Sequence, residues 1–125
     1  PRTLDWLQPS YDLGYNVVTM DEFKKRGIDE VIQETLDKIG DNPIYITFDL
    51  DSLDASVAPA VSNIEPSFTG FTIDEAKALI QSVKNKNVIG GDVVCLMPTK
   101  DQKNNITSMV AASIMFEIIS VIAYK

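Results

Sequence analysis

The chain has 125 residues, with 11 Lys and Arg against 18 Asp and Glu, one cysteine and no histidine. Without an imidazole, these residues cannot supply Ser-His-Asp catalysis, Cys-His catalysis or a zinc site with histidine ligands. A formal net charge of −7, with the cations scattered among carboxylates, argues against binding to a nucleic-acid backbone.

The expected location follows from two features of the sequence. Cys95 is the one cysteine, so it has no partner for an internal disulfide, and the first residues do not resemble a secretion signal. Both features predict an intracellular protein, cytoplasmic or mitochondrial. The sequence begins with Pro1 and not with Met, so we expect a processed or partial polypeptide, and the missing histidines would then describe only this part of it.

The predicted elements alternate between strands and helices. Short apolar, β-branched runs indicate strands, whereas i, i+3, i+4 spacing and a Thr-x-x-Glu capping box indicate helices. Residues 1–15 show no period and are expected to be irregular. In chain order, the sequence predicts a strand at 16–20, a helix at 28–39, a strand at 44–48, a long loop at 52–71, a helix after Thr72, a strand at 88–95 and a helix at about 105–123.

This alternation is typical of βαβ units, and strands that are apolar on both faces predict a three-layer αβα fold with a mainly parallel sheet. Three strands make a narrow sheet, so we expect further strands from a missing part of the chain or from a partner. The last predicted helix is interrupted by polar residues, among them Glu117. That interruption argues against a membrane span and predicts a helix that is buried on most faces.

Asp49 and Asp51 have the most chemical content, because they follow a predicted strand and lie two positions apart. On extended backbone this spacing places both carboxylates on one side, in the crevice where α/β sheets bind ligands. Two adjacent carboxylates repel each other unless a cation or a shared proton relieves them, and Mg²⁺ or Mn²⁺ prefers such oxygen ligands. The alternative is that these acids cap the following segment, and we favour that role for Asp54.

Two known families carry a motif of this kind. A strand that ends in Phe-Asp-Leu-Asp resembles the first motif of haloacid dehalogenase-type phosphatases. That resemblance implies a Mg²⁺-dependent phosphatase with Asp49 as nucleophile and Asp51 as general acid. However, Ser52-Leu53 stands where those phosphatases have Gly-Thr.

A more specific resemblance is to the C-terminal region of the ureohydrolases, the family of arginase, agmatinase and formimidoglutamase. Four blocks agree with that family in order and approximate spacing over about residues 15–123. The blocks are Thr47-Phe48-Asp49-Leu50-Asp51-Ser52-Leu53-Asp54-Ala55, then Ala58-Pro59, then Gly70-Phe71-Thr72, and finally Gly90-Gly91-Asp92 through Cys95 and Pro98 to Asp101, followed by a helix after Thr107.

The resemblance implies that residues 1–125 are the C-terminal part of a single arginase-like α/β domain. It also implies two Mn²⁺ ions whose bridging hydroxide attacks a guanidino or formimino carbon. Asp49 and Asp51 would be metal ligands and Asp54 would support the loop. The histidine ligands would come from a missing N-terminal part or a partner chain, and a homo-oligomer, trimer or hexamer, is expected because ureohydrolases commonly form one.

Cys95 stands where the family has a Glu whose carboxylate is expected to pair with the substrate's guanidinium. A neutral thiol removes that charge-assisted hydrogen bond, so either the substrate differs or activity is lost. The simpler interpretation of Cys95 is a small buried apolar residue. Three hypotheses follow: a manganese-dependent hydrolase active only with its N-terminal part, a degenerate scaffold or assembly protein, and a magnesium-dependent phosphatase.

Overall fold

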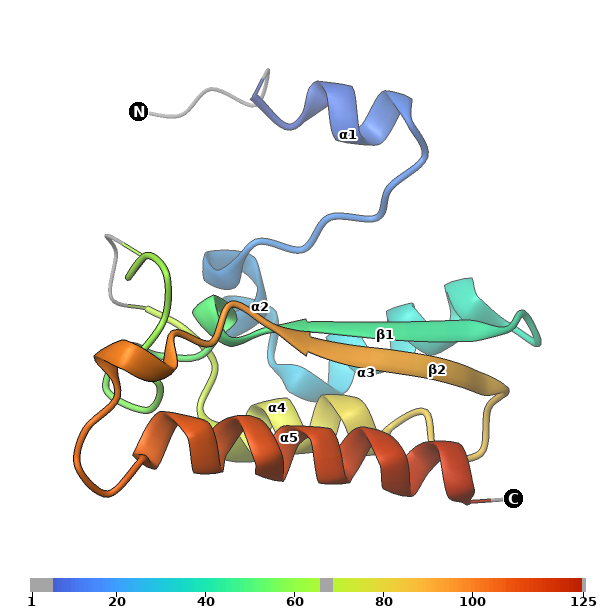
Figure 1. The fold of residues 1–125 in the computed structure, drawn as a ribbon. Helices are drawn as coiled ribbons and strands as arrows, with labels where there is room; N and C mark the ends of the chain where they lie inside the picture. Colours follow the sequence, from blue (N-terminus) through green and yellow to red (C-terminus); the bar gives the residue numbers. More distant parts are fainter. Residues whose placement is uncertain (1–5, 66–68, 125) are drawn as a thin grey trace.

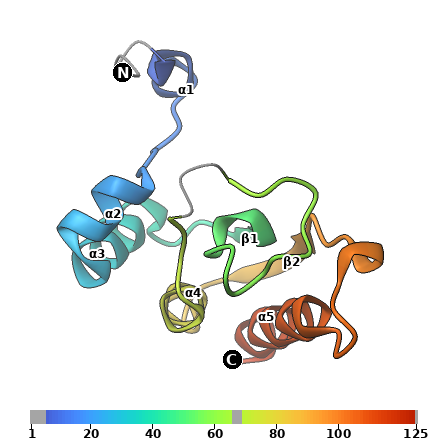
Figure 2. The ribbon, with the colours of Figure 1, turned by 90° about the vertical axis from the view of Figure 1, so that its left-hand side faces the viewer.

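A two-stranded parallel sheet forms the centre of the fold. The structure is a computed structural model and describes residues 6–65 and 69–124. Strands β1 (Ile44–Asp49) and β2 (Val88–Val94) pair in parallel. Helices α4 (Ile73–Gln81) and α5 (Ile106–Ala123) pack side by side against one face of this sheet (Figures 1 and 2). This arrangement confirms the α/β class with parallel strands.

In the described part of the chain, three helices precede the sheet: α1 (Gln8–Asp12), α2 (Met20–Arg26) and α3 (Ile28–Ile39). The short α1 lies apart from the other elements and buries no residue (Figures 1 and 2). It corrects the expectation that residues 1–15 are irregular throughout. The strand predicted at 16–20 is also wrong, because this segment pairs with no strand among the residues that the structure describes. The Thr19 hydroxyl instead caps α2 by accepting the Glu22 N–H at 3.2 Å.

The other predicted elements are confirmed to within a few residues, and their local signals explain why. Helix α4 has the predicted capping box, since the Thr72 hydroxyl accepts the Glu75 N–H and the Glu75 carboxylate accepts the Thr72 N–H. Helix α3 ends at Gly40, which has a φ of +56° that suits glycine. These helices therefore begin and end where sequence-local hydrogen bonding dictates.

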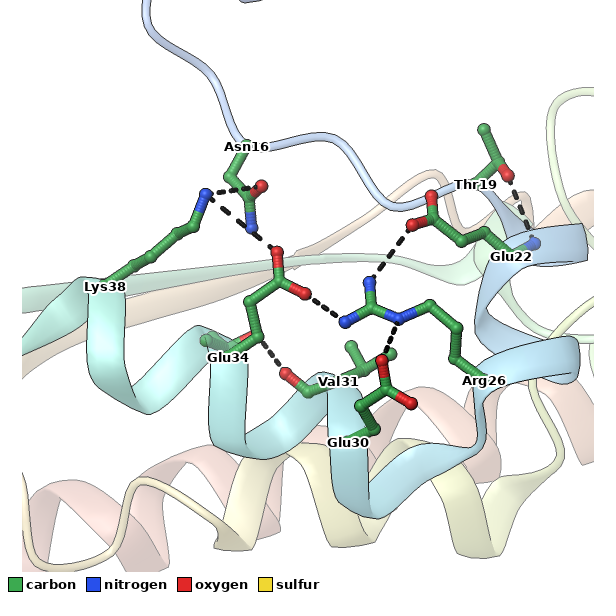
Figure 3. Close-up of polar contacts among 9 residues, drawn as sticks. Asn16, Thr19, Glu22, Arg26, Glu30, Val31, Glu34 and Lys38 are labelled. Carbon is green, nitrogen blue, oxygen red and sulfur yellow. Dashed lines mark hydrogen bonds and ion pairs between the residues drawn. The ribbon is translucent and has the colours of Figure 1, made fainter.

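Arg26 joins α2 to α3 (Figure 3). Its guanidinium forms ion pairs with three carboxylates, those of Glu22, Glu30 and Glu34. Hydrogen bonding to Glu34, and then to Glu30, raises the pKa of Arg26 above its ordinary value, so this charge stays fixed. Lys38 extends the network by donating to the Asn16 side chain at 2.9 Å, which holds the segment before α2 against α3.

The α2–α3 pair docks on the rest of the molecule through apolar and polar contacts, and Leu36 and Ile39 of α3 pack against the core. The buried ring of Phe23 meets the ring of Phe71 edge to face, with their centroids 5.0 Å apart. Beside it, Lys24 pairs with Glu75 of α4 at 2.6 Å. Phe71 lies at the end of the long loop and Glu75 in the first turn of α4, so α2 contacts the junction between that loop and α4.

The core lies between the sheet and the α4–α5 layer. The fully buried side chains Leu50, Ile114 and Ile118 belong to it. Gly91 of β2 lets α5 approach the strand closely, because a Cβ at Gly91 would lie 2.6 Å from Ile118 Cγ2. Among the described residues, helices α4 and α5 cover one face of the sheet, and on the opposite face Tyr45 is 59% exposed.

Helix α5 is less buried than its sequence predicted. Its inner face is in the core, but Met109, Phe116 and Ile119 are 62%, 67% and 55% exposed. By length and composition alone it could also cross a membrane, although core helices of globular proteins share these properties. The expectation of burial on most faces is therefore wrong for the described part of the chain, where a second apolar face has no cover.

Candidate metal centre

Three potential metal ligands meet at the carboxyl ends of the two strands. Asp49 is the last residue of β1 and pairs with Val94, the last residue of β2, so Cys95 follows directly beside it. Asp51 lies in the short 3₁₀ turn that continues β1. One ligand atom from each of Asp49, Asp51 and Cys95 lies within 4.8 Å of the other two. The parallel pairing of the strands thus brings together residues that are far apart in sequence.

The turn after β1 holds the two aspartates close together. The Asp49 carboxylate accepts the Asp51 N–H at 2.9 Å, and the Ser52 hydroxyl donates to the Asp49 carbonyl at 2.6 Å. Leu50, fully buried between them, anchors the turn in the core. The predicted extended backbone is therefore wrong at Asp51, because these hydrogen bonds curl the chain into a 3₁₀ turn and not into a continued strand.

The Asp51 carboxylate is poorly satisfied by the protein. Its Oδ1 atom is buried and has no hydrogen-bond partner among the residues that the structure describes. Burial raises the pKa of Asp51, and the neighbouring charges of Asp49 and Glu65 raise it further. A buried carboxylate oxygen without a donor costs free energy unless a cation or a proton compensates it. The sequence did not identify Glu65 as a residue of this site, because an acidic residue in a long loop is too common to indicate one.

Cys95 borders both carboxylates. It is partly buried and adopts a φ of +73°, which is uncommon for any residue other than glycine. Hydrogen bonding with Asp49, burial and the nearby charges of Asp49 and Asp51 raise the pKa of Cys95. These surroundings therefore favour the neutral thiol over the thiolate.

Asp54 acts on the loop at 52–71. Its carboxylate accepts both the N–H and the hydroxyl of Ser56, at 2.9 and 2.6 Å, which lowers the pKa of Asp54. Its own N–H donates to the Phe71 carbonyl at 2.9 Å, and this bond closes the neck of the loop. Gly70 is required there, because a Cβ would lie 2.4 Å from the Asp54 nitrogen. These contacts hold the loop beside the carboxylates.

The far side of the loop is fixed to the start of α5. The Thr107 hydroxyl is fully buried and accepts the Ala60 N–H at 3.1 Å, while the Ala60 carbonyl accepts the Met97 N–H at 3.0 Å. The loop and the segment after β2 therefore form one hydrogen-bonded unit. Sequence reasoning placed Thr107 only at the start of a helix, since its contact with Ala60 is non-local.

Comparison with known proteins decides the family. The model of the arginase family matches residues 4–120. The chain belongs to the arginase family. It is 36% identical over 114 residues to the agmatinase of Enterobacter sp. (strain 638) and 37% identical over 114 residues to the agmatinase of Escherichia coli O7:K1 (strain IAI39 / ExPEC). Each match covers 91% of this chain and 36% of the agmatinase, so the chain spans little more than a third of those proteins.

Solved structures of arginase-family proteins have the same fold. Proclavaminate amidino hydrolase from Streptomyces clavuligerus superposes with a TM-score of 0.84 at 30% identity, over 99% of this chain and 40% of that one. Formimidoylglutamase from Bacillus subtilis gives 0.82 at 28% identity, over 96% and 38%. The predicted ureohydrolase resemblance is therefore confirmed, and the phosphatase hypothesis loses its basis. The roles of Asp49, Asp51 and Cys95 stay predictions.

Proposed function

We propose that this chain is the C-terminal part of a manganese-dependent ureohydrolase that hydrolyses a C–N bond of a guanidino or formimino substrate. The observation that carries the proposal is the buried Asp51 Oδ1, which lacks a hydrogen-bond partner in the described residues and lies beside a second carboxylate, that of Asp49. The agmatinases and the formimidoylglutamase to which the chain is similar support the substrate class.

The residues present fit part of a Mn²⁺ site. Asp49 and Asp51 would hold the ion, because carboxylates are ligands that Mn²⁺ prefers. When bound, the metal supplies Lewis-acid activation of a water molecule. The chain's own part is to fix the carboxylates: the Asp51 N–H and the core anchor at Leu50 orient them. Further ligands would come from another part of the polypeptide or from a partner chain, and a homo-oligomer is part of the proposal.

The charge of the site suits a cationic amidine. Asp49, Asp51 and Glu65 place three carboxylates near one another, and this concentration of negative charge attracts a guanidinium. An intracellular location stays a prediction, and the bacterial agmatinases give no support to a mitochondrial one.

A second candidate, a degenerate scaffold without activity, is favoured by one observation. Cys95 supplies a neutral thiol at the position where the family resemblance leads us to expect a carboxylate for the substrate. The two candidates differ in a measurable way, because a hydrolase needs the Asp49–Asp51 pair to bind a metal, whereas a scaffold does not.

The test uses the full-length polypeptide that carries this chain. We expect it to bind Mn²⁺ and, when loaded, to release urea from agmatine or a related guanidine, or formamide from a formimino compound. Asp51→Asn should lower Mn²⁺ affinity by at least about tenfold. The matched control is Asp41→Asn, the same change at an exposed position before the opposite end of β1. Mn²⁺ binding without release of urea or formamide would favour the scaffold.

A further inference from the structure

We propose that Cys95 is a third metal ligand, so that one thiolate and two carboxylates bind the ion. The site would then bind borderline ions such as Co²⁺ and Zn²⁺ as well as Mn²⁺. The inference rests on the proposed function, since it concerns the same site, and it deepens that function by specifying the metal. Thiolates favour softer ions than carboxylates do, and the substitution of a sulfur ligand therefore changes selectivity.

The distances suit one ion. The ligand atoms of Asp49, Asp51 and Cys95 all lie within 4.8 Å of one another. With metal–sulfur bonds of about 2.3 Å and metal–oxygen bonds of about 2.0–2.2 Å, two ligand atoms on opposite sides of an ion are up to about 4.5 Å apart. Small side-chain rotations would therefore bring all three atoms to bonding distance of a shared cation.

The arrangement of the three ligand atoms supports the same conclusion. The Cys95 sulfur borders carboxylate oxygens of both Asp49 and Asp51, so sulfur and oxygen converge on one point. A cation at that point takes the place of the proton: the S–H bond breaks, a sulfur–metal bond forms with the sulfur electron pair, and the proton leaves to solvent. The same cation compensates the buried Asp51 Oδ1, which has no donor among the described residues.

The backbone around Cys95 is held in place by contacts on its far side. Leu96 forms an isolated antiparallel bridge with Val61, and the Met97 N–H donates to Ala60 at 3.0 Å. These contacts maintain the positive φ of Cys95, which a flexible segment would relax. The fold therefore fixes the position of the thiol. A cysteine that served only as a small apolar core residue would have no reason to lie beside two carboxylates.

The experiment titrates the full-length polypeptide, stripped of metal by a chelator and kept reduced, with Co²⁺. A bound thiolate gives a sulfur-to-cobalt charge-transfer band in the near ultraviolet. We expect this band in the wild type, its loss in Cys95→Ser, and a Co²⁺ affinity lower by at least about tenfold in that variant. Mn²⁺ affinity should change much less, because Mn²⁺ prefers oxygen ligands. Asp41→Asn should keep both the band and the affinity.

Several results would overturn the inference. Co²⁺ bound without the band, or a band that persists in Cys95→Ser, would show that this sulfur is not a ligand, while Mn²⁺ binding and hydrolysis would still support the proposed function. Binding of neither ion would remove both. If Cys95→Ser fails to fold, the wild-type band and Cys95→Ala provide the same comparison.

Discussion

Asp101 accepts hydrogen bonds from both the backbone N–H and the hydroxyl of Ser108, at 2.8 and 2.7 Å. The same carboxylate accepts the N–H of Thr107 at 3.1 Å. These N–H groups belong to the first turn of α5, where an α-helix has no internal acceptors for them. Asn105, the residue before the helix, makes no side-chain cap, so Asp101 performs the capping from a distance and ties the segment after β2 to α5.

Replacing Asp101 should therefore destabilise the protein in a pH-dependent way. Partial burial acts to raise the pKa of Asp101, but the hydrogen bonds from Ser108 and its neighbours outweigh it and hold the pKa at about 2. Because the folded pKa lies below the ordinary value of about 3.9, the carboxylate stabilises the fold above that value, and this contribution is lost as the pH falls through about 2. Thermal unfolding of Asp101→Ala at pH 7 should show a Tm lower by roughly 2–4 °C.

The control for this prediction is Asp41→Ala, which changes an exposed aspartate in the turn before β1. Its Tm should follow the wild type at every pH. The Asp101→Ala difference should shrink between pH 4 and pH 2, roughly the interval between the two pKa values. A Tm difference that is constant across this interval would show that the carboxylate charge does not support α5.

Thr107 offers a second test of how the loop is held. Thr107→Val keeps the shape of the side chain but leaves the buried Ala60 N–H without an acceptor, which should lower the free energy of unfolding by about 1–3 kcal/mol. Thr107→Ser keeps the hydroxyl and removes one methyl group. Hydrogen exchange distinguishes the two: the Ala60 amide should lose protection in Thr107→Val and keep it in Thr107→Ser. Equal protection in both variants would contradict the role assigned to the hydroxyl.

The sequence predicts those features that depend on local signals. The apolar period of α3 and the capping box at Thr72 and Glu75 determine their helices without reference to the rest of the chain. The prediction failed at 16–20 because β-branched residues favour a strand only where a partner strand exists, and no local signal reveals one. There the hydroxyl of Thr19 caps a helix instead.

The candidate site was predictable in part for the same reason. The rule that ligands bind at the carboxyl ends of parallel strands placed Asp49 and Cys95 at one edge of the sheet, and the structure brings them together. The 3₁₀ turn at Leu50–Ser52 and the positive φ of Cys95 were not predictable, since both depend on contacts with distant segments. The Arg26 network was missed because three glutamates spread over two helices look like ordinary surface charges.

The close approach of α5 to β2 provides a test of packing. A Cβ at Gly91 would lie 2.6 Å from Ile118 Cγ2 and 2.8 Å from the Ile46 carbonyl oxygen. Gly91→Ala should therefore push the helix from the strand and cost about 1–3 kcal/mol, as overpacking of a core usually does. At Gly90 the nearest atoms are ring carbons of the exposed Tyr45, at 3.0 and 3.1 Å, and that ring can move.

Denaturant unfolding of both glycine variants provides the measurement. Gly90→Ala is the matched control, because it makes the same change one residue away in the same strand, and its midpoint should fall less than that of Gly91→Ala. Equal midpoints in the two variants would show that the contact between Gly91 and Ile118 does not limit how closely α5 packs.

Cys95→Glu tests whether the neutral side chain at this position limits the use of a cationic substrate. The prediction assumes the proposed hydrolase function and uses the full-length polypeptide with a guanidino substrate. A carboxylate at position 95 could accept a charge-assisted hydrogen bond from the guanidinium, a contact worth about 1.5–3 kcal/mol. The KM should therefore fall by roughly 10- to 100-fold relative to Cys95→Gln, which has the same shape without the charge.

The comparison of Glu with Gln isolates that charge. Both variants remove the thiol, and both place a longer side chain at a position whose φ is +73° in the present structure, so backbone strain changes alike in the two. A carboxylate at position 95 can also bind the metal, so Mn²⁺ affinity is measured for each variant and KM is compared with both saturated with Mn²⁺. Equal KM values in Cys95→Glu and Cys95→Gln would mean that the guanidinium does not reach this position, and that the identity of residue 95 affects the metal and not the substrate.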